Sequence, residues 1–292
     1  DNMSAVFFNE LGLKQADLNL NIQDGSNSGM LSLMIPAIEK VIQEQKPNLV
    51  LVYGDTNTTL AGALAAKKIH IPVAHIEAGL RSFNMAMPEE INRIVTDRIS
   101  DVLFVPTKTG LANLQNEGFE HFGSNIILTG DIMLDAALYY GAFSEKRAKI
   151  YAGLGLVKDA YVLCTIHRQE NTDDVSKLKE IILALNEVNI TNPVIVPLHP
   201  RTQKIIQQNN ILCLFKIIDP VGYFDMLELL KNCQLVITDS GGLQKEAYYF
   251  LKNSIIVREQ TEWLELIEHG FSVLAGSDGQ KIIASFNMMK DK

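Results

Sequence analysis

The chain has few cysteines, no long hydrophobic run and no signal peptide. Its three cysteines, Cys164, Cys213 and Cys233, stand apart without CxxC spacing, so we expect reduced core residues rather than disulfides or a zinc site. No apolar run approaches the roughly 18 residues that a membrane span needs. These absences predict a cytoplasmic protein with no membrane partner.

Positive charge is also scarce, because 26 Lys and Arg stand against 34 Asp and Glu, for a formal net charge of -8. A nucleic-acid-binding domain carries a basic stripe, so we expect no nucleic-acid partner. The sequence has no HExxH or Cys/His spacing, no GxGxxG and no Walker loop, and we therefore predict neither a metal nor any other cofactor. What remains is an ordinary globular composition, long enough for about two domains.

Strands and helices alternate strictly through most of the chain, because short apolar runs are followed by segments with apolar residues at helical spacing. We predict strands over 48–53, 71–76, 101–105, 125–129, 160–166, 193–198, 213–218, 234–238, 254–258 and 271–274. We predict helices over 3–11, 28–46, 57–68, 88–99, 108–117, 174–188, 201–208, 222–232, 241–250 and 261–268. This alternation is typical of an α/β fold with parallel sheets covered by helices on both faces.

The alternation lapses between residues 138 and 158, where the helical period is lost. We place the domain boundary there, with an N-terminal Rossmann-like domain over 1–140, a linker over 141–158 and a C-terminal Rossmann-like domain over 159–292. Two such halves in tandem predict a ligand cleft between them. The chain opens without Met inside an expected helix, so we expect sequence to be missing before Asp1.

Three carboxylates follow apolar runs or open a helix in the N-terminal half. Asp55 follows Val-Leu-Val-Tyr-Gly, Glu77 follows Val-Ala-His-Ile, and Glu89 lies in Met-Pro-Glu-Glu-Ile-Asn-Arg. Open α/β sheets bind ligands beyond the carboxyl ends of their strands, so neighbouring strands would bring these three acids to one cleft. Alternatively, Asp55 caps a helix, and Glu89 and Glu90 complement a helix dipole. Glu77 has no capping position, so outside a site its carboxylate would be desolvated without purpose.

Polar residues also follow the predicted strands of the C-terminal half. His167 and His199 each stand after a strand, and each is either a residue of the cleft or part of a rigid turn. The segment Leu-Val-Ile-Thr-Asp-Ser-Gly-Gly-Leu-Gln-Lys-Glu predicts a strand, a tight turn and a helix that hold a phosphate through backbone N–H groups. The alternative is a simple helix start capped by Asp239 or Ser240. Glu246, further into that helix, is placed to contact sugar hydroxyls beyond the phosphates.

Six motifs in order closely resemble the non-hydrolysing UDP-N-acetylglucosamine 2-epimerase family. They are Gly-Asp-Thr-Asn-Thr-Thr, His-Ile-Glu-Ala-Gly-Leu-Arg, Met-Pro-Glu-Glu-Ile-Asn-Arg, His-Arg-Gln-Glu-Asn, Pro-Leu-His-Pro-Arg and Thr-Asp-Ser-Gly-Gly-Leu-Gln-Lys-Glu-Ala. The resemblance implies the GT-B fold, in which two Rossmann-like domains face a cleft. It also implies an isomerase that interconverts UDP-GlcNAc and UDP-ManNAc without metal or nicotinamide, usually as a homodimer, for surface polysaccharide biosynthesis.

The resemblance implies a mechanism as well. The family eliminates UDP to a 2-acetamidoglucal and adds it back with a proton delivered to the other face of C2, because the C2 proton is too weakly acidic for simple abstraction. By motif, Asp55, Glu77 and Glu89 match the acid/base carboxylates, and His167 matches a catalytic or substrate-contacting histidine. Which carboxylate removes the proton and which delivers it stays open.

The resemblance also assigns residues to substrate binding. The matching positions are Arg93, Val221, Met226, Ser240, Gly241, Gly242, Glu246 and Trp263. Residues 240–242 match the diphosphate loop, Glu246 matches the carboxylate that holds the ribose, and Val221 and Met226 match the uracil pocket.

The chain departs from the family pattern in two ways. The family opens with a strand and a Gly-x-Arg-Pro-x-x-x-Lys loop that supplies an Arg and a Lys, and it closes with a helix. Both are expected to be missing here, so we predict little or no activity for the chain as given. Trp263 stands where UDP-GlcNAc members have an Arg that touches substrate. With Ser-Phe-Asn-Met over 82–85, it resembles the branch that epimerises UDP-2,3-diacetamido-2,3-dideoxyglucuronate.

Two other function classes stay open from the residues. A GT-B glycosyltransferase would share the two halves, the diphosphate loop and the ribose carboxylate, but it would not require three acids in the N-terminal half. A nucleotide-sugar sensor would bind the UDP-sugar without forming a glucal or an epimer.

Overall fold

The computed structural model describes residue 8 and residues 10–148 and 150–292. The chain forms two compact units, one of residues 16–132 and one of residues 133–292 with the described residues up to Gln15. The helix predicted over 3–11 falls largely outside the described residues. Among the residues described, none of the helices combines the length and the apolar character that a membrane crossing requires.

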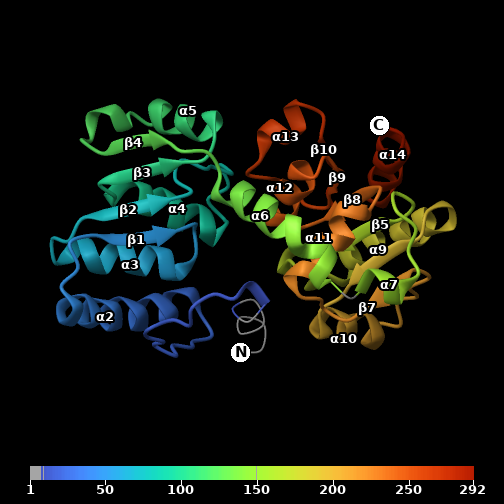
Figure 1. Ribbon diagram of the computed structural model, residues 1–292, viewed down its shortest axis with the longest axis horizontal. Helices are drawn as coiled ribbons and strands as arrows, with labels where there is room; N and C mark the ends of the chain where they lie inside the picture. Colours follow the sequence, from blue (N-terminus) through green and yellow to red (C-terminus); the bar gives the residue numbers. More distant parts are fainter. Residues whose placement is uncertain (1–7, 9, 149) are drawn as a thin grey trace. The chain divides into compact units, whose positions relative to one another are not determined.

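The unit of residues 16–132 is built on a parallel sheet whose strands lie in chain order (Figure 1). The strands are β1 (Val50–Tyr53), β2 (Val73–Ile76), β3 (Val102–Val105) and β4 (Asn125–Leu128). The helices are α2 (Asn27–Gln45), α3 (Asn57–Lys68), α4 (Pro88–Ile99) and α5 (Lys108–Asn116), with a 3-10 turn η1 (Phe119–His121). Tyr53 pairs with Ile76, so β1 and β2 end side by side.

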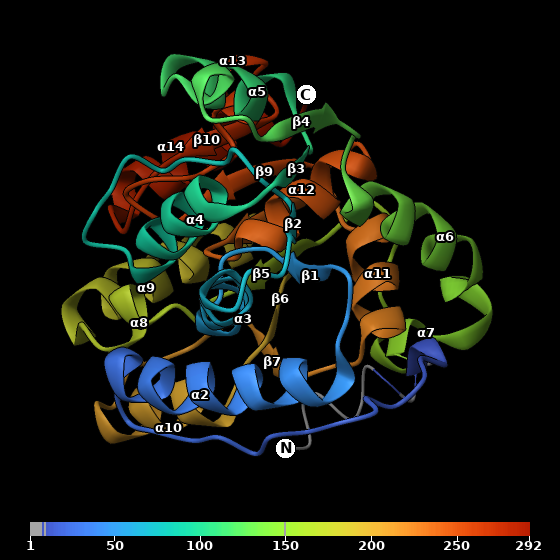
Figure 2. The same cartoon turned by 90° about the vertical axis from the view of Figure 1, so that its left-hand side faces the viewer.

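The core of this unit lies between the sheet and its helices. Helix α2 lies beside α3 in both views (Figures 1 and 2), and Ile42 of α2 and Ala63 of α3 pack with Val52 and Val73 of the strands. The alanines of α3 favour a helix and lose no side-chain entropy when they are buried. This close packing fixes the carboxyl ends of β1 and β2.

The unit of residues 133–292 contains a larger parallel sheet in the order β10-β9-β8-β5-β6-β7. Its strands are β5 (Val162–Thr165), β6 (Val194–Pro197), β7 (Lys216–Ile218), β8 (Leu235–Thr238), β9 (Asn253–Ile256) and β10 (Ser272–Leu274). Its helices are α6 (Ile132–Arg147), α7 (Ile150–Leu154), α8 (Gln169–Thr172), α9 (Val175–Thr191), α10 (Pro200–Gln208), α11 (Tyr223–Asn232), α12 (Gly241–Tyr249), α13 (Leu264–Glu268) and α14 (Gly279–Met289).

Both faces of the larger sheet are buried. Successive residues of a strand point to opposite faces, and accordingly Val162 and Cys164 of β5 belong to the core formed with α9 and α14. Leu163 belongs to the core formed with α11 and α12. The strand order reverses between β5 and β8, and such a switch point is where open α/β sheets bind ligands. The predicted α/β fold with Rossmann-like halves is confirmed.

Two segments differ from the predicted elements. Residues 141–158, predicted as a linker, contain the end of α6 and all of α7. Apolar and polar residues are spread around α6, so this helix has little periodic signal. Helix α14 follows the last predicted strand, and Asp278 caps it by accepting bonds from the N–H groups of Gln280 and Lys281.

Candidate active site

The turn after β1 presents Asp55. Gly54 in this turn has a left-handed backbone with φ of +63°, which glycine adopts without steric cost. Helix α3 is capped by Thr56, whose Oγ1 accepts a hydrogen bond from the N–H of Thr59 at 3.3 Å. Asp55 is therefore not the cap, and its carboxylate instead contacts the guanidinium of Arg93.

The turn after β2 presents Glu77 in a strained backbone. Its φ is +74°, a conformation that costs a non-glycine residue on the order of 1–3 kcal/mol. Glu77 Oε2 lies 3.4 Å from the position that a Cβ on Gly54 would take. The turns that carry Asp55 and Glu77 are therefore direct neighbours, as the pairing of β1 with β2 requires.

Helix α4 brings Glu89 to the same region. Glu89 is half-buried in its first turn, and Asn92, one turn on, donates a hydrogen bond from Nδ2 to the carbonyl oxygen of Asp55 at 2.9 Å. Arg93, predicted to bind substrate, is buried between the carboxylates of Asp55 and Glu90. The three predicted acids thus come from three adjoining segments of one unit.

Glu90 has a structural task in this arrangement. It is fully buried, and its carboxylate accepts hydrogen bonds from the N–H groups of Ser82 at 2.9 Å and Phe83 at 2.8 Å. It thereby holds the loop that precedes α4.

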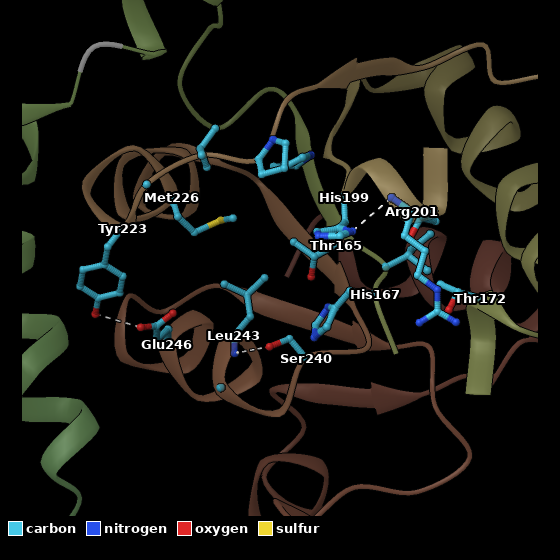
Figure 3. A pocket seen from close by; sticks show the side chains of 17 residues that line it. Thr165, His167, Thr172, His199, Arg201, Tyr223, Met226, Ser240, Leu243 and Glu246 are labelled. Carbon is cyan, nitrogen blue, oxygen red and sulfur yellow. Dashed lines mark hydrogen bonds between the residues drawn. The ribbon is translucent and has the colours of Figure 1, made fainter. Parts of the chain in front are cut away.

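A cavity of about 580 Å³ lies at the carboxyl ends of β5, β6 and β8 in the other unit (Figure 3). Six residues predicted from the sequence line it, namely His167, Val221, Met226, Ser240, Gly242 and Glu246. Apolar side chains lie at one end and the turn after β8 lies at another. The cavity therefore offers an apolar surface for a base and polar groups for a sugar and a phosphate.

The turn after β8 is built to receive an anion. Ser240 caps α12, and its Oγ accepts a hydrogen bond from the N–H of Leu243 at 3.3 Å. Gly241 and Gly242 open the helix, whose unpaired N–H groups and dipole favour negative charge. Trp263 Nε1 lies 3.7 Å from the position that a Cβ on Gly241 would take, so the predicted Trp263 stands beside this turn.

Asp239 does not cap α12 but holds the turn after β5. Its buried carboxylate accepts hydrogen bonds from the N–H of His167 at 3.0 Å and the N–H of Arg168 at 2.9 Å. His167 Nδ1 lies 3.1 Å from Asp239 Oδ1. Burial raises the pKa of Asp239, but the hydrogen bonds and charge of His167 outweigh it and the pKa falls below its usual value. Asp239 therefore orients His167 toward the cavity.

Glu246 is paired with a tyrosine inside the cavity. Tyr223 Oη donates a hydrogen bond to Glu246 Oε1 at 2.9 Å (Figure 3). Burial raises the pKa of Glu246, and the bond from Tyr223 and the charge of Lys245 oppose this only in part. Burial and the neighbouring Glu246 also raise the pKa of Tyr223. The carboxylate is thus poised to exchange this partner for ligand hydroxyls.

The cavity also contains residues that the sequence left open or did not single out. His199 lines it and also forms the turn before α10, since its Nδ1 accepts from the N–H of Arg201 at 3.2 Å. His199 is therefore both a residue of the cavity lining and part of a turn. Arg201, which pairs with Asp173, ends the Pro-Leu-His-Pro-Arg motif without an assigned role, and Tyr223 is a lining residue that the sequence did not single out. Among the described residues, no group of three or more His, Cys, Asp or Glu is placed to hold a metal ion.

Known proteins resemble this chain along its length. The family model for UDP-N-acetylglucosamine 2-epimerase matches residues 1–292. A UDP-2,3-diacetamido-2,3-dideoxy-D-glucuronate 2-epimerase of Pseudomonas aeruginosa is 51% identical over 285 residues, which cover 97% of this chain and 79% of that protein.

Two solved structures show the same similarity. The UDP-GlcNAc 2-epimerase of Methanocaldococcus jannaschii, in complex with UDP-GlcNAc and UDP, superimposes with a TM-score of 0.91 at 42% identity, over 100% of this chain and 82% of that one. The UDP-GlcNAc 2-epimerase of Neisseria meningitidis, bound to UDP-GlcNAc, has a TM-score of 0.87 at 32% identity, over 98% of this chain and 80% of that one.

Proposed function

Because the chain belongs to the UDP-N-acetylglucosamine 2-epimerase family, we propose that it inverts C2 of a UDP-linked 2-acetamido sugar and interconverts UDP-GlcNAc and UDP-ManNAc. The observation that carries this proposal is the pair of turns that set Asp55 and Glu77 side by side. Transfer of a sugar requires a single base, whereas elimination and re-addition require groups that remove and deliver protons.

The reaction proceeds in two steps, elimination of UDP and its re-addition. A carboxylate takes the proton from C2 while the C1–O bond breaks, its electron pair leaves with UDP, and a 2-acetamidoglucal forms. UDP then adds back to C1 while a second group delivers a proton to the opposite face of C2. The helix start at residues 240–242 stabilises the charge on the departing diphosphate, because its N–H groups are fixed in place before the bond breaks.

We assign the proton transfers to Asp55, Glu77 and Glu89, and substrate contact to His167. Arg93 contacts the carboxylate of Asp55 and so fixes where that acid stands. In the other unit, Glu246 accepts from the ribose hydroxyls, and Val221 and Met226 contact the uracil.

A second substrate is favoured by two observations. The relative at 51% identity acts on UDP-2,3-diacetamido-2,3-dideoxy-D-glucuronate, and Trp263 stands where UDP-GlcNAc members have an Arg. Lys245 Nζ lies 3.9 Å from the centre of the Trp263 ring, so a positive charge is retained near the diphosphate turn. A uronate sugar carries an additional carboxylate, which such a charge attracts.

One experiment tests the reaction and the substrate together. The protein, with any flanking sequence that the natural chain has, is incubated in deuterated water with UDP-GlcNAc or with UDP-2,3-diacetamido-2,3-dideoxyglucuronate. We expect deuterium at C2 of the epimer of one of them. Transfer of the sugar to an acceptor without deuterium at C2 would establish a glycosyltransferase, and tight binding without any exchange would establish a sensor.

We further propose that the protein acts as a cytoplasmic homodimer in surface polysaccharide biosynthesis. This proposal is supported by the resemblance of the six motifs to the family. Light scattering on the purified protein tests the dimer, and a mass equal to one chain would refute it.

A further inference from the structure

The unit of residues 16–132 contains a buried carboxylate outside the proposed set of acids. Asp97 of α4 has no exposed surface. Its Oδ2 accepts hydrogen bonds from the N–H of Gly79 at 3.0 Å and from Nη1 of Arg81 at 2.7 Å. Its Oδ1 lies 2.7 Å from Nδ1 of His75. His75, Gly79 and Arg81, all from the segment at the end of β2, thus contact the side chain of Asp97.

His75 extends these contacts to the first turn of the site. The histidine is fully buried in β2, and its Nε2 donates a hydrogen bond to the carbonyl oxygen of Gly54 at 2.7 Å. Gly54 immediately precedes Asp55. Through His75, Asp97 is therefore connected to the turn that presents Asp55.

The bond from Gly79 connects Asp97 to the second turn. Gly79 lies two residues after Glu77, whose backbone is left-handed, and Gly79 itself has φ of +82°. A Cβ on Gly79 would come within 2.5 Å of the carbonyl oxygen of Gly110, so this turn is tightly enclosed. A strained conformation persists only where its surroundings determine it, and the Asp97–Gly79 bond is one such determinant.

Arg81 lies between the carboxylates of Asp97 and Glu117. Burial lowers the pKa of Arg81, but its hydrogen bond to Glu117 and the charge of Asp97 outweigh this and raise the pKa. The guanidinium Nε lies 2.7 Å from Glu117 Oε1. A buried ionic cluster is no more stabilising than well-packed apolar residues of equal volume, so its retention calls for a role beyond stability.

We propose that Asp97 is a positioning residue that, together with His75, fixes the separation and direction of the Asp55 and Glu77 carboxylates. This inference rests on the proposed function, because it concerns the acids of that reaction. Catalytic groups must be held to within a fraction of an ångström, and a displacement of about 1 Å costs roughly 100-fold in rate. Because the Asp97 side chain is bonded to both turns, directly or through His75, it fixes the positions of the two acids relative to each other.

The test compares Asp97→Ala with Asp101→Ala. Asp101 is a matched control at the opposite end of the sheet, where its Oδ2 accepts from the N–H of Val73 at 2.8 Å and its Oδ1 lies 2.8 Å from Nζ of Lys67. We expect Asp97→Ala to lower kcat by roughly 100-fold with a change in KM of less than about threefold, while Asp101→Ala leaves both near the parent values.

If Asp97→Ala does not fold, conservative variants that keep some of the hydrogen bonds still test the proposal. The amide of Asp97→Asn can accept from Gly79 and donate to His75, so this variant should retain more kcat than Asp97→Ala. Likewise His75→Gln, which can donate to Gly54, should retain more than His75→Leu. Equal losses within each pair, or equal losses in the Asp97 and Asp101 variants, would overturn the proposal.

A measurement without turnover separates this inference from the proposed function. Hydrogen exchange should become faster in segments 53–57 and 76–80 of the Asp97→Ala protein, change less in Asp97→Asn, which keeps the bonds to Gly79 and His75, and stay unchanged in those segments of Asp101→Ala. Absence of epimerisation in the parent protein would refute the proposed function alone. Unchanged exchange in both segments would refute the positioning role alone.

Discussion

Asp55 precedes helix α3 but does not cap it. A substitution at Asp55 should therefore change the proposed proton transfer without removing the helix cap. We predict that Asp55→Asn lowers epimerisation at least about 100-fold, because the amide cannot take or give the proton. Its carboxylate is partly exposed, the amide can still accept from the buried Arg93, and Arg93 keeps its pair with Glu90, so the free energy of unfolding should fall by only about 1 kcal/mol.

Thr56→Ala is the matched variant at the next residue. Loss of the cap should lower the free energy of unfolding by about 1 kcal/mol and leave most of the activity. Urea unfolding and an epimerisation assay on both variants check the pair. The assignment of Asp55 would be wrong if its variant kept the activity of the parent.

We predict that the binding of UDP-GlcNAc depends on pH through Glu246. Burial raises its pKa above the ordinary value of a glutamate, and ribose hydroxyls bind the ionised form. The affinity for UDP-GlcNAc, whose diphosphate diester does not titrate in this range, should therefore fall as the pH is lowered through the raised pKa. Calorimetry from pH 8 downward measures this, and Glu246→Gln should show a weaker but flatter profile. An equal slope in both proteins would contradict the role of Glu246.

At the residue scale, local motifs predicted the cavity side chains but not the Asp97 contacts. Val221 and Met226, which the family resemblance assigned to the uracil pocket, line the cavity, and so does Glu246, which follows the predicted phosphate turn. His75 opens the motif around Glu77, but the motif assigned it no role, and Asp97 lies in an ordinary helix. Their partners come from other segments of the chain, so only the folded packing brings them together.

At the scale of elements, Asp239 joins the end of β8 to the turn after β5. Removing it leaves the part-buried N–H groups of His167 and Arg168 and the buried amide of Asn171 without this acceptor, so Asp239→Ala should cost on the order of 3 kcal/mol of unfolding free energy. Asp278→Ala removes a comparable but exposed set of backbone bonds at α14 and should cost about 1 kcal/mol.

The pH dependence of this contribution has a definite sign. The pKa of Asp239 is lowered in the folded protein, so its stabilisation is present above the ordinary pKa of an aspartate and is lost as the pH falls through the lowered value. Urea unfolding of the parent and the Asp239→Ala protein at pH 7 and at acidic pH measures it. A constant difference between the two proteins at every pH would contradict this reading.

The order of strands and helices followed from the sequence because buried parallel strands are apolar throughout and their helices are amphipathic. Where that contrast weakens, the prediction was wrong or incomplete. The strand predicted over 213–218 is reduced to β7 over 216–218. Helix α6 lacks a single apolar face, and α14 was not predicted although Asp278 is a standard capping residue.

At the scale of the molecule, the two compact units have separate sheets and cores. The cavity lining belongs to one of them, so UDP alone should reduce hydrogen exchange in segments around 165–172, 220–226 and 238–246. At a hundredfold excess over Kd, UDP should stabilise that unit by about 2.7 kcal/mol. Equal protection of residues 50–105 would contradict this localisation.

The family prediction is confirmed, since the family model matches the chain throughout. Six short motifs carried it. Five of them lie at turns that follow strands and the sixth opens α4, in positions where function restricts the residue type more than packing does. The prediction of the substrate branch depended on Trp263 and on residues 82–85. The position of Lys245 beside the Trp263 ring became visible only in the folded chain.

The left-handed backbone of Glu77 lowers the stability of the folded chain, although the side chain supplies a proposed acid. Glycine tolerates this conformation without strain, so Glu77→Gly should raise the melting temperature while it removes a proposed acid. A search for heat-tolerant variants that ignores turnover would therefore favour the loss of this proposed acid.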